Sequence, residues 1–430
     1  MNKPEEEAIK QAEKDTTMPK IYSGTDWGVF RLDDLLSVLG RTIKKDDTNK
    51  VLVFLCQLLA FTEDDQLNIA FTSPSSSGKS YLALEIASLF PSDAIIDSGY
   101  ASPASFFHLN SKYNKETKTY SIDLERKILI FLDMPHFQLL ERLRSLFSHD
   151  KKVIKVKIVD KQKSGITTKE IDLIGHSSVI FCSSSFSTDE QEQTRFLFLS
   201  PEVTQEKIRS AVHEVFEKNT DPIAYYRKLN SDPKRKELIQ RIEAIREEKI
   251  KVIKLHDRAK LEEMFFKRNK MLKPRHSRDA KRICNIIKGF ALLNLWYRNY
   301  NEAKGEITTT NEDYENGFKI WDEIAVSQDL GIAPYLLNIF KEIILPLYQE
   351  KGGGLTRAEV LKQHFKIYGR HLQDFRFRKE YLPMLENSGL IYQEQSSDDG
   401  RVYLIFPLVD STIVLASKEE SESVEIPDKY

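Results

Sequence analysis

The sequence predicts an α/β protein whose first half folds around a parallel β-sheet. Between about Leu32 and Ser200, short apolar runs alternate with longer segments of helical periodicity. Apolar runs bounded by turn residues are typical of buried strands, and strands that alternate with helices are typical of parallel sheets. The predicted helices are 48–60, 80–89 and 137–147, and the predicted strands are 67–71, 128–132 and 179–182.

The composition indicates an ordinary globular protein. The chain has 430 residues, 40% of them hydrophobic and 30% charged, with a formal net charge of −1. Any surface for a polyanion must therefore come from a local patch. No apolar run reaches the roughly 18 residues of a membrane span, and the N-terminus is polar, so we expect a cytoplasmic protein without a signal peptide. Cys56, Cys182 and Cys284 have no paired spacing, which favours buried thiols over a zinc site or disulfides.

Five segments are predicted along the chain. Residues 1–20 and the residues after Ser417 are polar, and we expect a disordered lead-in at 1–20 and a disordered acidic tail at 411–430. Residues 21–200 form the predicted α/β core, and 201–330 have a helical pattern that suggests a lid or linker. Residues 331–410 contain helices followed by two β-like runs, which is the order of elements in a winged helix-turn-helix.

A phosphate-binding loop is predicted at residues 73–80, which read SPSSSGKS and lie between a strand and a helix. Small residues let the backbone N–H groups approach phosphates, and the helix N-terminus adds positive potential. Lys79 is expected to reach the β- and γ-phosphates, and the Ser80 hydroxyl to bind Mg²⁺. Ser73 replaces the usual first glycine, and the alternative interpretation is a serine-rich surface turn. The residues predicted to bind ATP are Ser73, Pro74, Ser75, Ser76, Ser77, Gly78, Lys79 and Ser80.

A second motif of ATP sites, a strand that ends in a carboxylate, is predicted at 127–133 (KILIFLD). Asp133 would hold the Mg²⁺. The next residues are Met134, Pro135 and His136, so no glutamate follows to orient the attacking water. That role stays open between Asp133, His136 and Glu141. The alternative is a buried strand that happens to end in an aspartate.

These motifs resemble, in order, those of a known family. SPSSSGKS, ILIFLD and SVIFCSSS are followed by DEQEQTRFLFLSPE at 189–202 and RDAKRICNIIKGFALLNLWYR at 278–298. The series resembles the AAA+ P-loop ATPases of MCM-like (minichromosome-maintenance-like) and primase-associated helicases from phages and mobile replicons. The resemblance implies an AAA+ core with a helical lid, ATP and Mg²⁺ as ligands, DNA as partner, and an oligomer that is expected to be a hexamer.

The resemblance also implies a place and a role for the strand at 178–182. It is expected to lie between the Lys79 strand and the Asp133 strand. Ser184, or else Ser183, would then contact the γ-phosphate or the attacking water as sensor 1. The alternative is that these serines are ordinary turn residues at a strand end.

Three arginines receive roles from the same resemblance. Arg195 is expected to be an arginine finger that reaches the γ-phosphate of a neighbouring subunit, where a planar permanent cation stabilises charge on the transferred group. Arg278 or Arg282 is expected to be sensor 2; the two are four residues apart and share a helix face. The alternatives are a surface salt bridge for Arg195 and a solvated basic face for the other two.

Two surfaces are predicted to touch DNA. Residues 151–173 form two alternating runs around KQKSG, which predicts a β-hairpin with Lys161 and Lys163 near its tip, where lysine could contact phosphates without reading sequence. The alternative is an edge hairpin kept soluble by lysine. The second surface is the predicted recognition helix of the winged helix, with Arg376, Arg378 and Lys379, although winged helices also bind proteins.

The sequence therefore favours an ATP-hydrolysing DNA motor, an oligomeric MCM-like helicase of DNA replication. The second hypothesis is a non-translocating AAA+ switch: a loader, a transposition regulator or a defence ATPase. The missing glutamate after Asp133 favours slow hydrolysis and hence this switch. The third hypothesis is a DNA-binding or scaffold protein with a degenerate ATPase core.

Overall fold

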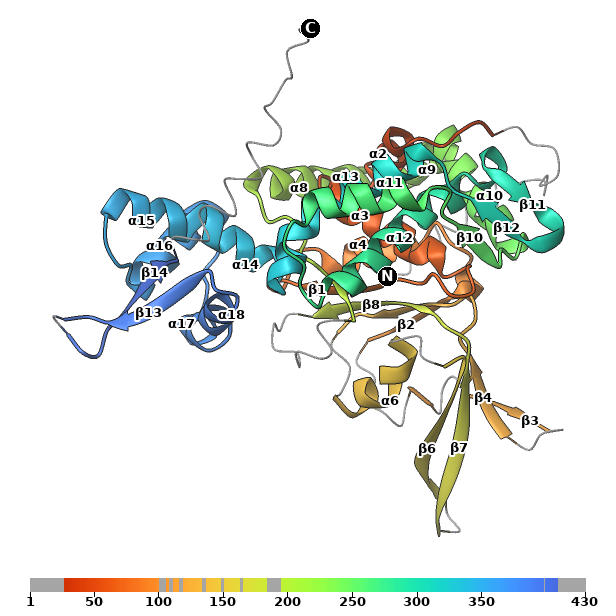
Figure 1. Cartoon of the computed structure of the whole chain (residues 1–430), viewed down its shortest axis with the longest axis horizontal. Coiled ribbons are helices and arrows are strands. Elements are labelled where there is room, and N and C mark those ends of the chain that lie inside the picture. The colour runs from red at the N-terminus through yellow and green to blue at the C-terminus, as the bar shows by residue number, and fades with distance from the viewer. Residues whose placement is uncertain are drawn as a thin grey trace, which may run out of the picture. The chain divides into compact units, whose positions relative to one another are not determined.

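The computed structural model describes residues 27–99, 106–107, 111–115, 119–133, 137–147, 151–162, 165–183, 195–397 and 399–408 (Figure 1). The predicted lead-in and acidic tail lie outside these residues. The described chain divides into two compact units. The first ends at Val326, and the second begins at Ser327 and also includes Val203–Gln205. Each unit is described by itself below.

A five-stranded parallel sheet organises the first unit. Its order is β2-β5-β8-β1-β9, and every neighbouring pair is parallel. The strands are β1 (Asn68–Thr72), β2 (Ile95–Ser98), β5 (Ile128–Phe131), β8 (Ser178–Ser183) and β9 (Leu197–Leu199). This confirms the predicted parallel sheet, with β1, β5 and β8 within one residue of their expected bounds at either end. β8 lies between β1 and β5, as the resemblance implied.

Both faces of this sheet are buried, because alternate residues of each strand enter two different hydrophobic clusters. Ile69 and Phe71 of β1 belong to one cluster, and Ala70 between them belongs to the other. The first cluster also contains residues from the helices α3 (Asp47–Leu59), α4 (Lys79–Ala87) and α12 (His276–Leu293). The second contains residues from α6 (Phe137–Phe147) and from a second sheet. The continuous apolar runs in the sequence thus reflect strands covered on both sides.

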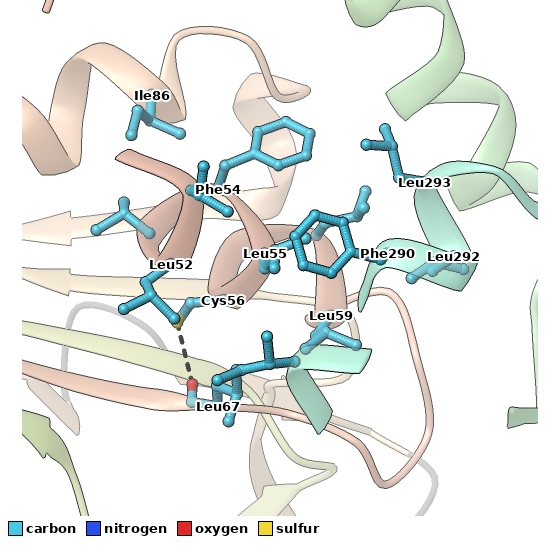
Figure 2. Close-up of a cluster of buried hydrophobic side chains, with 14 of the residues drawn as sticks. Leu52, Phe54, Leu55, Cys56, Leu59, Leu67, Ile86, Phe290, Leu292 and Leu293 are labelled. Carbon is cyan, nitrogen blue, oxygen red and sulfur yellow. Dashed lines mark hydrogen bonds between the residues drawn. The ribbon is translucent and has the colours of Figure 1, made fainter. Parts of the chain in front are cut away.

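Helix α3 is the centre of the first cluster (Figure 2). The Cys56 thiol donates a 3.1 Å hydrogen bond to the Leu67 carbonyl just before β1, which ties the helix to the sheet. On its other side α12 approaches closely, since a Cβ on Gly289 would lie 3.1 Å from a Leu55 methyl carbon. Helices α3, α4 and α6 match the predicted segments within two residues at either end; α2 (Leu32–Leu39) was not predicted.

The predicted lysine-rich hairpin exists as β6 (Val153–Gln162) and β7 (Gly165–Ile174). Its register pairs Val153 with Ile174 and Gln162 with Gly165. The hairpin is part of a four-stranded sheet of order β3-β4-β7-β6, which also contains β3 (Lys112–Asn114) and β4 (Thr119–Asp123). Sequence patterns did not predict these two strands.

The predicted lid or linker at 201–330 has a helical pattern in the sequence, and the prediction of helix is wrong at three places. A small sheet of order β10-β12-β11 interrupts the helices, with β10 (Val252–Lys254), β11 (Asn299–Asn301) and β12 (Glu306–Thr308). Strands of three residues are too short to show a period of two, so helical neighbours dominate the pattern. The other helices are α8 (Gln205–Thr220), α9 (Pro222–Ser231), α10 (Pro233–Glu247), α11 (Arg258–Arg268) and α13 (Asn311–Leu330).

The second unit has the predicted order of helices followed by a hairpin. One continuous helix runs through α14 (Pro334–Ile339), a π-helical stretch (Phe340–Ile344) and α15 (Leu345–Lys351). The next helices are α16 (Arg357–Tyr368) and a second continuous helix of α17 (Asp374–Arg376), a π-helical stretch (Phe377–Tyr381) and α18 (Leu382–Asn387). Strands β13 (Ile391–Gln395) and β14 (Tyr403–Pro407) close the unit, and Leu355 bridges Ile405 of β14. The winged-helix interpretation of this order stays a prediction.

No single helix in the described part of the chain is long and apolar enough to cross a membrane; α13 and the α14–α15 helix meet that criterion only when taken together.

Candidate nucleotide-binding site

The predicted phosphate loop lies at the carboxyl end of β1, between the strand and α4. Ser76 and Gly78 both have left-handed backbone conformations, with φ of 60° and 92°. A residue with a Cβ rarely adopts a left-handed conformation. At Ser76 the surrounding structure therefore imposes this conformation on the loop. Left-handed residues beside a helix N-terminus form concave arrays of N–H groups that bind anions.

The Ser73 side chain, which replaces the usual glycine, closes the base of the loop. Its hydroxyl lies 2.5 Å from the hydroxyl of Ser77, and both side chains are buried. Lys79 is also buried, and its ammonium donates hydrogen bonds to the main-chain carbonyls of Ser73 (2.8 Å) and Pro74 (2.9 Å). The loop is thus curled around its own lysine rather than extended. Ser75 and Ser76, at the outer turn of the loop, are exposed.

Ser80 and Asp133 lie at the same end of the sheet. The Ser80 hydroxyl is 3.5 Å from the carbonyl oxygen of Leu132, the residue before Asp133. Both groups act on the buried Cys182 thiol of β8: burial raises its pKa to about 11, the Ser80 hydroxyl and the Lys79 ammonium lower it, and Asp133 raises it. The hydroxyl, the ammonium and the carboxylate therefore all belong to the carboxyl edge of the sheet, where β1, β5 and β8 end.

The predicted sensor strand ends beside the phosphate loop. Ser183 is buried at the end of β8, and its register partner is Thr72, the last residue of β1. Ser184 lies outside the described residues, as does His136. Glu141 is exposed on α6.

Arg195 lies at the opposite edge of the sheet from the loop. It stands two residues before Leu197, whose register partner on β1 is Ile69. Ser73 follows four residues after Ile69, which is about 13 Å further along the strand at about 3.3 Å per residue. Since β1 and β9 are parallel neighbours, Arg195 precedes the amino end of β9, whereas the phosphate loop follows the carboxyl end of β1. Arg195 therefore cannot reach the loop of its own chain.

The two sensor 2 candidates have different surroundings. Arg282 is buried; its guanidinium donates to Asp279 (2.9 Å) and to the carbonyl of Phe196 (2.8 Å). Burial lowers the pKa of Arg282 to about 10, although Asp279 opposes this change. Arg278, one turn earlier on α12, is exposed. The Phe196 contact places this end of α12 beside Arg195, at the amino edge of the sheet.

A polar cluster next to the phosphate loop escaped the sequence analysis. Ser200 donates a 2.7 Å hydrogen bond to the carbonyl of Thr72, immediately before the loop. Asp46, buried and left-handed with φ of 58°, accepts from the main-chain N–H of Glu202 (2.7 Å) and pairs with Lys207. This cluster joins the start of α3, the end of β9 and the start of α8. Its residues are far apart in sequence and have no shared motif, so only the tertiary fold brings them together.

The predicted DNA contacts are placed as follows. Lys161 is in β6, one residue before its end, and Lys163 lies outside the described residues. In the second unit, Arg376 is half-buried and bonds to Glu380 at 3.2 Å. Arg378 and Lys379 are exposed on the next turn of the same helix. Two of these three cations are thus available at the surface of that unit.

The strand order, the loop between β1 and α4, and the carboxylate at the end of β5 define the fold of a P-loop NTPase of the AAA+ class. No family model and no curated protein matches the sequence. Among solved structures, the chain resembles a full-length MCM homolog from Methanopyrus kandleri at 13% identity and a TM-score of 0.41. That match covers 75% of this chain and 62% of the homolog.

Two further structures are similar at greater distance. The SCCmec type IV Cch helicase aligns at 13% identity and a TM-score of 0.34, over 93% of this chain and 75% of the helicase. The C-terminal region of NrS-1 aligns at 11% identity and a TM-score of 0.24, over 87% of this chain and 75% of that region. Because these likenesses are distant, the functional proposal depends on the geometry of the chain's own residues.

Proposed function

We propose that the chain is an ATP-hydrolysing DNA motor that works as an oligomer, with a hexamer as the expected form. The phosphate loop fits a polyphosphate, because its left-handed residues, the N-terminus of α4 and the Lys79 ammonium all favour negative charge. Ser80 and Asp133 would hold Mg²⁺, which would neutralise charge on the β- and γ-phosphates when bound; the 3.5 Å between the Ser80 hydroxyl and the carbonyl oxygen of Leu132, the residue before Asp133, supports this. Ser183 or Ser184, at the end of β8, would contact the γ-phosphate or the attacking water.

The separation of Arg195 from the phosphate loop carries the oligomer part of this proposal. P-loop ATPases stabilise the developing charge on the transferred phosphoryl group with an arginine. In this chain Arg195 is at the wrong edge of the sheet to serve its own site. A second copy, placed with its amino edge against the first copy's carboxyl edge, would supply Arg195 in trans. Arg278 would lie at the same junction and is our choice for sensor 2, since Arg282 is buried in contacts with Asp279 and Phe196.

The β6–β7 hairpin and the second unit are the proposed DNA-binding surfaces. Lys161 and Lys163 near the hairpin tip would contact backbone phosphates, which requires no sequence recognition and therefore suits a translocating motor. Arg376, Arg378 and Lys379 would bind the backbone as part of a winged helix-turn-helix. Residues 201–330 would then act as the lid of the ATPase core, and 331–410 as the appended DNA-binding domain.

One observation favours a second function, a non-translocating switch. Met134 follows Asp133, so the position that would carry a water-orienting glutamate holds no acid or base. Slow hydrolysis suits a switch better than a motor, because a switch such as a loader or a regulator changes state only once per nucleotide.

Strand separation distinguishes the two functions. We would measure phosphate release and unwinding of a forked DNA duplex with wild-type protein, ATP and Mg²⁺, using Lys79→Ala as the inactive control. ATP-dependent unwinding supports the motor. DNA-stimulated hydrolysis without unwinding supports the switch and overturns the motor, and nucleotide binding without any turnover overturns both.

A further inference from the structure

Helix α8 presents its apolar face outward. Its inward positions are polar: Lys207, Ser210, Glu214 and Lys218 are the residues of this helix that are buried or half-buried. Its apolar residues, by contrast, are exposed: Ile208 (46%), Val212 (45%), Val215 (55%) and Phe216 (64%). These four recur at the spacing of one helix face. An amphipathic helix normally turns such a face toward the core, so the reversal indicates a surface that another element covers.

Named contacts fix α8 in this orientation. Lys207 pairs with the buried Asp46 and donates to the carbonyl of Glu202. Glu214 accepts from Lys44 at 2.7 Å and from the Tyr225 hydroxyl. Rotating the apolar face inward would break these contacts and leave buried charges unpaired. The start of α8 lies at the carboxyl edge of the sheet, because the Asp46 cluster joins it to the segment in which Ser200 bonds to Thr72.

A second exposed apolar cluster lies at the amino edge. The loop between α11 and α12 exposes Met271 (80%) and Leu272 (58%), and Phe266 of α11 is half exposed. This loop leads into the first turn of α12, and Arg282, in the second turn, bonds to the carbonyl of Phe196. The two apolar clusters therefore lie at opposite edges of one sheet, the first beside the phosphate loop and the second beside Arg195.

Charge distinguishes between the possible pairings of these clusters. The loop cluster is surrounded by the exposed cations Lys267, Lys270 and Lys273, so two copies of it would repel each other. The rim of α8 carries both signs: Arg209 is exposed, and so are Asp221 and Glu217, the last of which pairs with Lys228 at 2.8 Å. It therefore repels a basic partner less than a second lysine-rich loop would. A contact between two α8 helices would bring two phosphate-loop edges together and leave both Arg195 edges outside, so that no trans site could form.

We infer that α8 of one copy docks on the Met271–Leu272 loop of the next copy, in a head-to-tail contact that completes the ATP site. This inference rests on the proposed function, since it names the surface through which Arg195 would reach a neighbouring phosphate loop. A head-to-tail contact uses two different surfaces and can close into a ring. The apolar residues would supply the attraction, and the loop's lysines would select α8 over a second loop.

Single substitutions test whether the two surfaces hold the assembly together. Full-length wild type, Phe216→Asp, Leu272→Asp and His213→Asp would be compared by size exclusion with light scattering, with Mg²⁺ and ATPγS. His213 is exposed on α8 away from the apolar face, so it is the matched control for an added charge. Wild type and control should assemble, and the other two should be monomers that melt at the temperature of wild type diluted until it too is monomeric, since assembly itself raises the melting temperature. Val212→Asp repeats the α8 test at an independent position.

Mixing the two monomeric variants tests the direction of the contact. The Leu272→Asp chain keeps α8, and the Phe216→Asp chain keeps the loop, so one contact and one ATP site should form between them. Its phosphate loop would come from the Leu272→Asp chain and its Arg195 from the other. Lys79→Ala should therefore abolish the recovered ATPase when placed in the Leu272→Asp chain and leave it at least half intact in the other.

Each contrary result has a definite meaning. Normal assembly of Phe216→Asp, or a recovered ATPase that ignores which chain carries Lys79→Ala, would overturn the inference and leave the oligomeric motor standing. A Phe216→Asp monomer that melts below monomeric wild type would show that another part of the same chain covers α8, which also overturns the inference. A wild type that hydrolyses ATP as a monomer would overturn the trans site itself.

Discussion

The ammonium of Lys79 lies 2.8 Å from the carbonyl oxygen of Ser73, the first residue of the phosphate loop. The same ammonium donates to the carbonyl of Pro74 at 2.9 Å, so both contacts stabilise its charge with main-chain dipoles. A phosphate entering the loop is a stronger acceptor than either carbonyl. Lys79 is thus held in place by contacts that a ligand can replace.

Lys79→Ala should abolish ATP turnover and weaken ATP binding at least tenfold, about 1.4 kcal/mol. The loss follows because the loop keeps its N–H groups but no longer carries a full positive charge at the phosphates. Binding of a fluorescent ATP analogue and phosphate release would measure the two effects. Lys319→Ala, on the exposed face of α13, is the control and should change neither. Unchanged turnover in Lys79→Ala would show that the phosphate loop takes no part in ATP hydrolysis.

Arg195→Ala should lower turnover about 1,000-fold and leave ATP affinity within twofold, because an arginine finger acts on the transition state. Single-turnover hydrolysis and equilibrium binding would be measured on the same preparation. Arg227, exposed on α9, supplies the control Arg227→Ala. Normal turnover in Arg195→Ala would exclude the arginine finger and support the alternative, a surface salt bridge.

Arg278→Ala and Arg282→Ala should separate catalysis from stability. Removing Arg282 leaves the Asp279 carboxylate and the Phe196 carbonyl without this hydrogen-bond donor in a buried site. The free energy of unfolding should therefore fall by about 2–3 kcal/mol. Removing the exposed Arg278 should change it by less than about 0.5 kcal/mol while reducing turnover. Urea unfolding and phosphate release would be recorded for both. A destabilised Arg278→Ala protein with normal turnover would reverse the assignment.

Sequence patterns predicted the long buried elements and missed the short ones. β5 is apolar over its whole length, and β1 and β8 are apolar between their polar end residues, so local composition is enough to predict them. β9 has three residues, and its role as the neighbour of β1 depends on pairing with residues more than 100 positions away. The three-residue strands β10, β11 and β12 were lost among helices for the same reason. Elements stabilised mainly by partners distant in sequence leave little local pattern.

The candidate site divides in the same way. The phosphate loop is one continuous segment, and its residues could be assigned without a structure. Arg278 and Arg282 share a helix face, so periodicity could not separate them; the contact with Phe196, 86 residues away, does. The Asp46 cluster joins residues separated by more than 150 positions and was invisible for that reason.

Acidification should weaken the second unit through His364. This imidazole is buried in α16, with Nε2 2.7 Å from the Tyr335 hydroxyl and Nδ1 3.0 Å from the Arg370 carbonyl. A carbonyl only accepts, so Nδ1 donates to it and Nε2 accepts from the tyrosine. Burial lowers the pKa of His364 below its ordinary 6.5. The neutral form is favoured on folding, so its stabilisation is complete above pH 6.5 and declines as pH falls below that value.

Hydrogen exchange of residues 356–369 at pH 7.5 and pH 5.5, corrected for the intrinsic pH dependence of exchange, would measure this change. Protection should fall at the lower pH in wild type. His364→Gln, which cannot gain a proton, should be less protected at pH 7.5 and should show a smaller fall. Equal losses in the two proteins would place the pH sensitivity elsewhere in the unit.

The hairpin lysines should contribute to DNA affinity through salt-dependent phosphate contacts. For a single strand, each neutralised phosphate adds about 0.7 to the slope of log affinity against log salt. The double variant Lys161→Ala, Lys163→Ala should therefore lower that slope by about 1.4 and weaken binding to all sequences alike. Lys155→Ala is a control on the same hairpin, because Lys155 is paired with Glu170 at 3.0 Å. Fluorescence anisotropy with an oligonucleotide across a salt series would measure the slopes. If the double variant and the control lowered this slope by the same amount, the hairpin lysines would serve to protect an exposed edge strand rather than to bind DNA.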